Sequence, residues 1–211
     1  MHRLSNGALM VAYEDGGNVC TKTSTDNGKS WSYAKCAFRA FDYALGNATC
    51  RVNCCNPEFA QLPNGDILIA CNYRPSVAEV DPYAIAVARS INSGLTYQTP
   101  KVLYQAAPRA TEGCWEPAPL VLPDSTVQLY LANESPYAAS DEQEISMLTS
   151  QDLGVTWSTE TTKVCFRTGH RDGMPVPIVS GKDLMVAIED NVNGQFNPYV
   201  VRRAFVKVWL S

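Results

Sequence analysis

Residues 24–31 read STDNGKSW, and variants of this stretch recur as SINSGLTY at 90–97 and SQDLGVTW at 150–157. We refer to them as the three turn segments. Recurrence at a fixed spacing is the sequence signature of repeat folds, so it decides the architecture. In the first copy, Asp26 can accept hydrogen bonds from backbone N–H groups of its own turn, Gly28 can supply a positive φ, and Trp31 can bury its ring between sheets.

The three turn segments are therefore predicted to lock hairpins rather than to bind a metal or a ligand. The second copy has Asn for Asp and Tyr for Trp, which keeps the hydrogen-bonding and stacking abilities. The residues with this predicted structural role are Asp26, Asn92, Asp152, Trp31, Tyr97 and Trp157.

A second repeat precedes each turn segment. Its copies are LSNGALMVAYED from Leu4, LPNGDILIACNYR from Leu62, LPDSTVQLYLANE from Leu122 and VSGKDLMVAIEDN from Val179. Each copy has an apolar strand, a tight turn such as Asn64-Gly65, and an alternating strand such as 66–70. Four short strands in each period of about sixty residues, without helical periodicity, are typical of propeller blades. We predict an all-β fold with one domain over 1–211 and blade repeats beginning near 4, 58, 118 and 175.

The turn segments resemble the Asp-box, or bacterial neuraminidase repeat, S-x-D-x-G-x-T-W, of the sialidase-like propellers. That resemblance implies a β-propeller of the six-bladed type. The chain holds enough repeats for an incomplete arc of about three to four blades, and we expect it to be a fragment of a longer protein. An open arc leaves sheet edges and apolar faces uncovered.

Strand parity predicts which residues share the functional face. If the Asn64-Gly65 turn joins the first two strands of a blade at the lower face, the turn segments also lie below. The residues before each first strand and after each second strand then lie above. They are Asn56, Glu116 and Gly173 before first strands, Glu14, Asn72, Ala132 and Glu189 at the ends of second strands, and Arg74, Glu134, Arg171 and Asp172 on the same rim.

Glu116 and Glu189 are the candidate catalytic residues. Glu116 lies in GCWEPAPL, between a proline and Trp115, whose ring could stack on a sugar, and Glu189 ends the apolar strand DLMVAIED. Glycoside hydrolysis needs one charged and one protonated carboxyl group flanking the scissile bond. Equally, both could be solvated rim residues or partners of arginines. Candidate substrate-binding residues are Trp115, Arg74, Asn56, Arg171 and Asp172; Glu14, Glu58, Glu134, Glu142 and Glu144 are expected to be surface charges.

The motifs CWEPAP, HRDGMPVP at 170–177 and AIEDN resemble the exo-acting arabinanases of glycoside hydrolase family 93. The resemblance implies a retaining enzyme that attacks α-1,5-linked arabinan from a chain end. It also implies that Glu116 is the nucleophile and Glu189 the acid/base. The related hydrolases place a tyrosine from a later blade beside this pair.

Two rival functions stay open. A sialidase would use a tyrosine nucleophile, an aspartate acid and three arginines that grip the sialic carboxylate, of which Arg74 and Arg171 could be two. A non-catalytic carbohydrate-binding propeller is the other rival. Whether Glu116 and Glu189 converge distinguishes the non-catalytic propeller from a hydrolase.

Composition limits the partners. Of 211 residues, 45% are hydrophobic and 18% charged, which is typical of a soluble globular chain. The net charge of −4 offers no basic face for nucleic acid, and no stretch is long enough to cross a membrane. A carbohydrate is the expected partner, and no cofactor is expected.

The eight cysteines lack the C-x-x-C spacing of zinc sites, so no metal is expected. Buried free thiols and disulfides are equally compatible with them. The sequence starts without a secretory signal, and glycosylation acceptor patterns occur at Asn47 and Asn133. We expect the longer parent protein to be extracellular or periplasmic.

Overall fold

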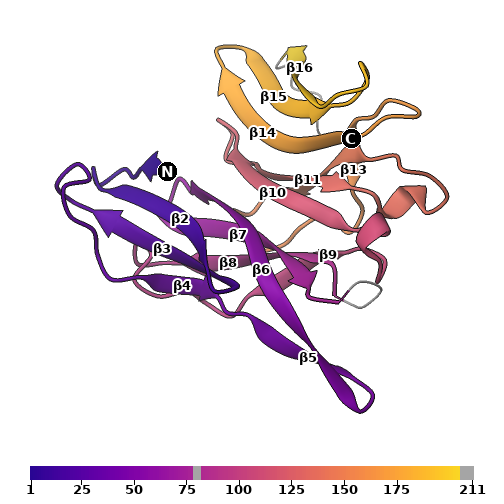
Figure 1. Ribbon diagram of the computed structural model, residues 1–211. Coiled ribbons are helices and arrows are strands. Elements are labelled where there is room, and N and C mark those ends of the chain that lie inside the picture. The colour runs from indigo at the N-terminus through magenta and orange to yellow at the C-terminus, as the bar shows by residue number, and fades with distance from the viewer. Residues whose placement is uncertain (78–81, 205–211) are drawn as a thin grey trace.

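The computed structural model describes residues 1–77 and 82–204 as four antiparallel sheets that follow one another along the chain (Figure 1). The first holds β1 (His2–Arg3), β2 (Leu9–Asp15), β3 (Asn18–Ser24) and β4 (Lys35–Phe38). The second holds β5 (Phe41–Leu45), β6 (Ala48–Gln61), β7 (Ile67–Pro75), β8 (Ala84–Ser90) and β9 (Lys101–Gln105). The third holds β10 (Cys114–Val121), β11 (Val127–Asn133), β12 (Glu144–Ser150) and β13 (Thr162–Cys165). The fourth holds β14 (Asp172–Ser180), β15 (Asp183–Asp190) and β16 (Asn197–Ala204).

Strand order equals chain order in every sheet, as the repeats predict. The tight turns between the first two strands of the blades use positive φ angles, at Gly7, Gly65, Ser125 and Gly181. Two short 3-10 helices, η1 (Ala110–Glu112) and η2 (Ser135–Tyr137), are the helical elements of the described chain. The all-β propeller prediction is confirmed.

The turn segments form the predicted hydrogen-bonded locks. Asp152 Oδ1 accepts a hydrogen bond of 2.8 Å from the backbone N–H of Thr156, and its Oδ2 accepts one of 2.6 Å from the Thr156 hydroxyl. The Ser150 hydroxyl accepts the N–H of Gly154 at 2.7 Å. Asp26 makes the equivalent bonds with Ser30. These hydrogen bonds lower the pKa of both aspartates to about 2.

The second turn segment keeps the lock with an amide. Asn92 Oδ1 accepts the backbone N–H of Thr96 at 2.9 Å, while its Nδ2 donates to the Thr96 hydroxyl at 2.8 Å. Asparagine can take the place of aspartate in this lock because the threonine hydroxyl can either donate or accept a hydrogen bond.

The aromatic residues of the turn segments differ in burial. Tyr97 packs against the first sheet and its hydroxyl lies 2.8 Å from the Thr21 hydroxyl, and Trp157 packs in the cluster between the second and third sheets. Trp31 is 37% exposed. Packing of the ring between sheets is thus found for Tyr97 and Trp157, which are partly buried. The predicted burial of Trp31 is wrong, because within the described residues no sheet precedes the first one to cover it.

The strand registers confirm the predicted parity. Ser90 at the end of β8 pairs with Ile67 at the start of β7, so that turn segment lies beside the Asn64-Gly65 turn. At the opposite end of the sheets, Trp115 pairs with Ala132 and Gly173 pairs with Glu189. The candidate catalytic residues and the turn segments therefore lie at opposite ends of the sheets.

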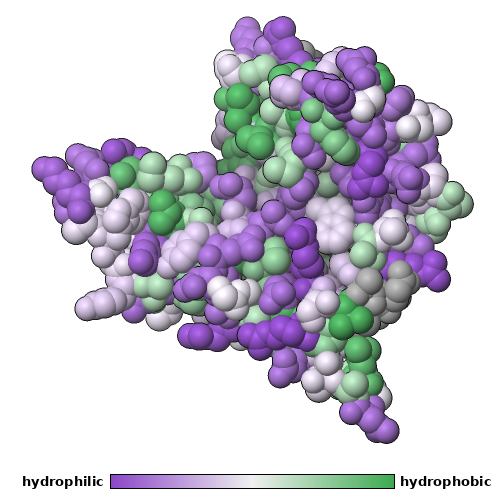
Figure 2. Space-filling model, viewed as in Figure 1, coloured by the Kyte–Doolittle hydropathy of each residue, from purple (hydrophilic) through white to green (hydrophobic). Residues whose placement is uncertain are grey.

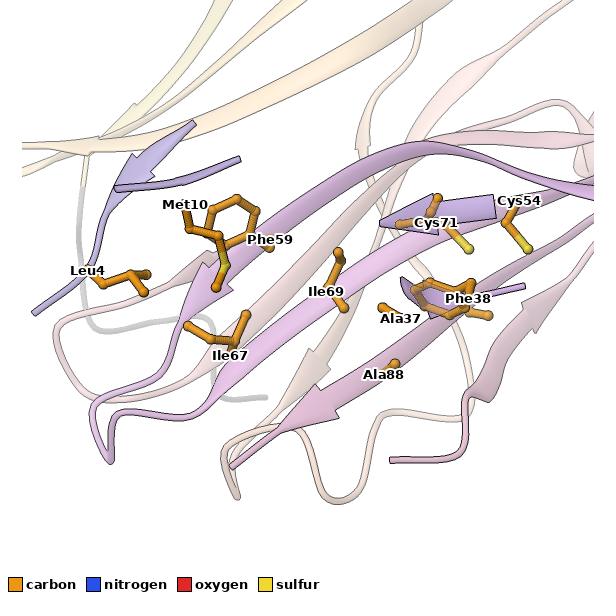
Figure 3. Packing of buried hydrophobic residues seen from close by; sticks show 12 residues of the cluster. Leu4, Met10, Ala37, Phe38, Cys54, Phe59, Ile67, Ile69, Cys71 and Ala88 are labelled. Carbon is orange, nitrogen blue, oxygen red and sulfur yellow. The ribbon is translucent and has the colours of Figure 1, made fainter. Parts of the chain in front are cut away.

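Apolar side chains from neighbouring sheets form three core clusters. In the first, Met10 of the first sheet meets Phe59, Ile67 and Ile69 of the second (Figure 3). Both faces of the middle sheets are covered in this way, which explains why β7 and β11 are almost continuously buried.

The innermost strands of the last three sheets run through a bulge that the sequence prediction took for a boundary. The bulge residues are Asn56, Glu116 and Met174, with φ of 50°, 56° and 51°, and a proline follows each one. A proline is tolerated at a bulge because no ladder hydrogen bond is needed there. The inner strands β6, β10 and β14 consequently begin before the predicted blade starts near 58, 118 and 175.

Two strands were not predicted. Residues of β1 pair with β2 and complete a four-stranded first sheet. β5 pairs with the start of β6 across a two-residue turn at Gly46-Asn47, and this hairpin projects from the second sheet (Figure 1).

The fourth sheet carries exposed apolar side chains, which gather over its β14 and β15 margin (Figure 2). Val176 and Ile178 of β14 are 58% and 47% exposed. The expectation of an uncovered apolar face thus holds at the end of the described arc. No helix within the described residues is long and apolar enough to span a bilayer.

The cysteines adopt both predicted states. Cys20 of β3 and Cys36 of β4 are cross-strand neighbours joined by a disulfide. The remaining cysteines are free thiols, five of them buried and Cys165 half-buried. Of the two glycosylation patterns, Asn47 is exposed at its hairpin turn, whereas Asn133 is fully buried and donates to the hydroxyls of Tyr104 and Ser146.

Candidate active site

A cavity of about 570 Å³ opens at the end of the sheets opposite the turn segments. Its walls come from the second, third and fourth sheets. The lining residues are Arg74, Pro75, Tyr83, Ala110, Trp115, Glu116, Glu134, Gln143, Arg171, Glu189 and Phe196. Strand parity predicted five of these residues for this rim, namely Arg74, Glu116, Glu134, Arg171 and Glu189. Trp115, predicted as a substrate contact, also lines the cavity.

Glu116 is held by the bulge in β10. Its backbone is in the left-handed region, and its Oε2 accepts a hydrogen bond of 2.7 Å from the backbone N–H of Met174 in the next sheet. A non-glycine residue in this conformation is strained, and such strain is concentrated at functional sites. The bulge therefore turns the carboxylate out of its own sheet and toward the fourth sheet.

Glu189 reaches the same cavity from β15. It pairs with Gly173, and a Cβ atom at Gly173 would lie 3.5 Å from Glu189 Oε1 and 2.8 Å from Gln143 Nε2. The absence of a side chain at this position lets both neighbours approach the backbone. Glycine at 173 thus makes room for the side chains that line this wall.

The charge of Glu189 acts on the Glu116 carboxyl group. Burial raises the pKa of Glu116, and the negative charge of Glu189 raises it further, against the lowering effect of the Met174 N–H bond. A raised pKa beside a second carboxylate is the electrostatic pattern expected of an acid and base pair. The predicted pair is therefore brought to one cavity, where the pKa of Glu116 lies above that of an ordinary glutamate.

Trp115 forms a fixed wall of the cavity. The guanidinium of Arg74 lies over the indole, 5.0 Å from its centroid, and the Tyr83 ring meets it edge-on at 5.5 Å. The indole Nε1 donates to Glu134 Oε2 at 3.0 Å. Because Arg74 covers one ring face, the predicted stacking of a sugar on Trp115 is restricted to the other face.

Glu134 was predicted to be a surface charge, and that prediction is wrong. The residue is only 4% exposed and takes part in an ion pair with Arg171. Arg171 also donates to Gln143 Oε1 at 2.8 Å and to the Asp141 carbonyl at 3.0 Å. Glu144 is buried as well and accepts hydrogen bonds from Tyr137 and Ser146. Both carboxylates lie in polar stretches, Asn133-Glu134-Ser135 and Glu142-Gln143-Glu144, which gave no sign of burial.

Two predicted substrate contacts lie elsewhere. Asp172 is fully buried, pairs with Arg167 and accepts a hydrogen bond from the Cys165 thiol, so it presents no surface to the cavity. Asn56 lines a smaller adjoining hollow of about 180 Å³ that shares Glu116 with the cavity. Its backbone N–H donates to Glu14 Oε1 at 2.7 Å.

Sequence reasoning missed Tyr83, Gln143 and Phe196 as lining residues. None belongs to a recurring motif, and their places depend on how connections fold over the sheet ends. In the part of the chain that the structure describes, no group of three or more His, Cys, Asp or Glu side chains could hold a metal ion.

Solved structures of other proteins share this fold, whereas comparisons of the sequence find no relative. Neither a protein-family model nor a curated protein matches the sequence. Among solved structures, an α-L-arabinofuranosidase from Fusarium graminearum, in a mutant form bound to an iminosugar inhibitor, superposes with a TM-score of 0.71 at 20% identity. The match covers 98% of this chain and 63% of that protein.

Two further structures are similar. An α-L-arabinanase from Penicillium chrysogenum in complex with arabinobiose has a TM-score of 0.70 and 20% identity, over 96% of this chain and 60% of that one. A Hadza microbial sialidase has a TM-score of 0.68 and 15% identity, over 96% and 44% of the two chains. This chain thus spans less than two thirds of these proteins. It has the fold of the sialidase-like β-propellers, which the arabinofuranosidase, the arabinanase and the sialidase share.

Proposed function

We propose that this chain carries the catalytic carboxylates of a retaining, exo-acting arabinanase that releases arabino-oligosaccharides from α-1,5-arabinan. The observation that supports it is the placement of Glu116 and Glu189, from adjacent sheets, in one cavity where the charge of Glu189 helps to raise the pKa of Glu116. The fold shared with glycosidases adds support at the level of reaction class.

The proposed reaction has two steps. One carboxylate attacks the anomeric carbon, while the other carboxyl group gives its proton to the departing glycosidic oxygen. The resulting glycosyl ester is then hydrolysed by a water molecule whose proton returns to the second carboxylate. Each step needs one charged and one protonated carboxyl group, which two coupled glutamates provide.

The two sources of support differ on the roles. The family resemblance assigns Glu116 as the nucleophile, whereas the raised pKa of Glu116 favours the protonated form required of the acid. We therefore propose Glu116 and Glu189 as the catalytic pair, without assigning the two roles. Azide added to the Glu116→Ala and Glu189→Ala variants assigns the roles, because a missing nucleophile yields a glycosyl azide of inverted configuration and a missing acid/base yields one of retained configuration.

The charge of the cavity favours a neutral sugar over a sialoside. Among the described residues its acidic and basic lining groups are three carboxyl groups, Glu116, Glu134 and Glu189, and two arginines, beside the phenol of Tyr83. Arg171 is engaged by Glu134 and Gln143, and Arg74 lies over Trp115. A sialic carboxylate would need a cationic clamp that these engaged arginines do not offer.

The proposed location is extracellular or periplasmic. The Cys20–Cys36 disulfide supports it, since disulfides persist in oxidising compartments.

A substrate panel tests the function. The protein is incubated with linear α-1,5-arabinan, with a sialyl-lactose and with a buffer blank, and the products are separated by anion-exchange chromatography. Release of short arabino-oligosaccharides is expected. Turnover of the sialoside alone would identify a sialidase, and arabinan binding without release would identify a non-catalytic propeller.

A further inference from the structure

Glu134 belongs to the third sheet, just after β11, and its carboxylate has no exposed face. Its side chain is 5% exposed, and its Oε2 accepts the indole N–H of Trp115 at 3.0 Å and the backbone N–H of Gly113 at 3.2 Å. Its own backbone N–H donates to the Gly113 carbonyl at 3.0 Å. Glu134 is therefore locked to Gly113 by both its backbone and its side chain.

The other oxygen is engaged too. Glu134 Oε1 accepts a hydrogen bond from Arg171 Nη2, which joins the third sheet to the segment entering the fourth. Three donors bind these two oxygens, so most of the lone-pair sites of this carboxylate are engaged within the protein. It is thus unsuited to act as a nucleophile or a proton donor.

The groups that Glu134 holds are those that face the cavity. Trp115 directly precedes Glu116, and Arg171 donates to Gln143, which also lines the cavity. Arg74 and Tyr83 contact the Trp115 ring, but among the described residues Glu134 makes the hydrogen bond to its N–H. A Cβ atom at Gly113 would lie 2.2 Å from the indole, so the ring has been fitted against this backbone.

We propose that Glu134 is a positioning residue that fixes the Trp115 indole and the Arg171 guanidinium in the lining of the cavity. Its kinetic consequence rests on the proposed function, whereas its structural consequence does not. A buried carboxylate shared by two donors from different sheets holds both in one geometry, because charge-assisted hydrogen bonds are short and directional.

Indole NMR tests the structural part. The chain has four tryptophans, and the Trp115 signal in a spectrum of ¹⁵N-labelled indoles is identified by its loss in Trp115→Phe. In Glu134→Ala we expect the Trp115 resonance to move upfield by more than the other indole signals. Glu134→Gln, which keeps the shape and removes the charge, serves if the alanine variant does not fold, and Glu134→Asp should restore part of the shift. Glu160→Gln, at an exposed bend, is the matched control.

Kinetics test the consequence for the site. Glu134→Gln should lower kcat/KM on arabinan by about tenfold to a hundredfold, mainly through KM, as expected when binding groups are misplaced by about 1 Å. The Glu134→Gln/Trp115→Phe double variant should lose less than the product of the two single losses. An unmoved Trp115 resonance in the Glu134 variants, or independent multiplication of the two kinetic losses, would overturn the proposal. If arabinan is not hydrolysed at all, the NMR result still decides the positioning role, and the proposed function alone fails.

Discussion

Glu116 of the third sheet binds the backbone N–H of Met174 in the fourth, with 2.7 Å between Oε2 and N. Glu14 of the first sheet binds the N–H of Asn56 in the second in the same way, also at 2.7 Å. In both contacts the donor is the backbone N–H of a bulge residue in an inner strand. Glu116 thus combines an inter-sheet structural contact with a place in the cavity, where burial and Glu189 oppose its ionisation.

Replacement of Glu116 by glutamine should stabilise the fold at neutral pH. The folded-state pKa of Glu116 is raised above its ordinary 4.5, so the native state loses stability as the pH rises through that raised value. Glutamine stays neutral and can still accept the Met174 N–H. We expect the Tm of Glu116→Gln to exceed that of the unsubstituted protein at pH 7, and the two Tm values to be equal well below pH 4.5. A lower Tm of Glu116→Gln at pH 7 would show that the charged form is favoured.

Asp152→Asn should be tolerated at pH 7, because Asn92 makes the same lock in the second turn segment. The Asp152 pKa of about 2 lies below its ordinary 3.8, so its contribution is present above 3.8 and is lost as the pH falls through about 2. Acid unfolding monitored by circular dichroism should therefore be less steep for Asp152→Asn in that window. Asp152→Ala, which removes the acceptor, should lower Tm at pH 7; an unchanged Tm would contradict the lock.

Trp157 and Trp31 occupy equivalent positions but differ in environment. Trp157 packs in the core cluster between the second and third sheets, whereas Trp31 is exposed. Trp157→Ala should cost about 2–3 kcal/mol of unfolding free energy, less than for a fully buried ring, and Trp31→Ala markedly less. Urea unfolding of both variants measures this difference. Equal costs would contradict the assigned packing.

The Cys20–Cys36 disulfide should lower the number of titratable thiols and raise the free energy of unfolding. Denatured, unreduced protein should titrate six thiols, corresponding to the free cysteines. The double variant Cys20→Ala/Cys36→Ala should lose about 3 kcal/mol, the chain-entropy value for a loop of this size. Eight titratable thiols in protein purified without reductant would refute the bond.

The sequence predicted the fold because its signals are local and repeated. Asn64-Gly65 and the three turn segments set hairpin geometry without help from distant residues. Strand parity then placed Glu116 and Glu189 at the same end of the sheets, because consecutive antiparallel strands alternate in direction. The β5 hairpin carries a comparable signal in Gly46-Asn47, but lies outside the repeat and was missed.

The finer site could not be predicted because it depends on inter-sheet contacts. Whether Glu134 is solvated or buried depends on Arg171, which is 37 residues away in sequence. Asp172 is a rim residue by strand parity, yet its charge is satisfied by Arg167 inside the fold. The burial of Trp31 depends on whether a neighbouring sheet covers it, which no local motif encodes.

The central claim is that Glu116 and Glu189 form one catalytic pair. The direct measurement is the rate of reducing-sugar release from linear α-1,5-arabinan by the parent, Glu116→Gln, Glu189→Gln and the exposed-site control Glu160→Gln. Each cavity variant should lose roughly 10²–10⁴-fold in kcat, as expected when a nucleophile or an acid/base is removed, while the control keeps the parent's rate. Parental rates in either Glu116→Gln or Glu189→Gln would contradict the account.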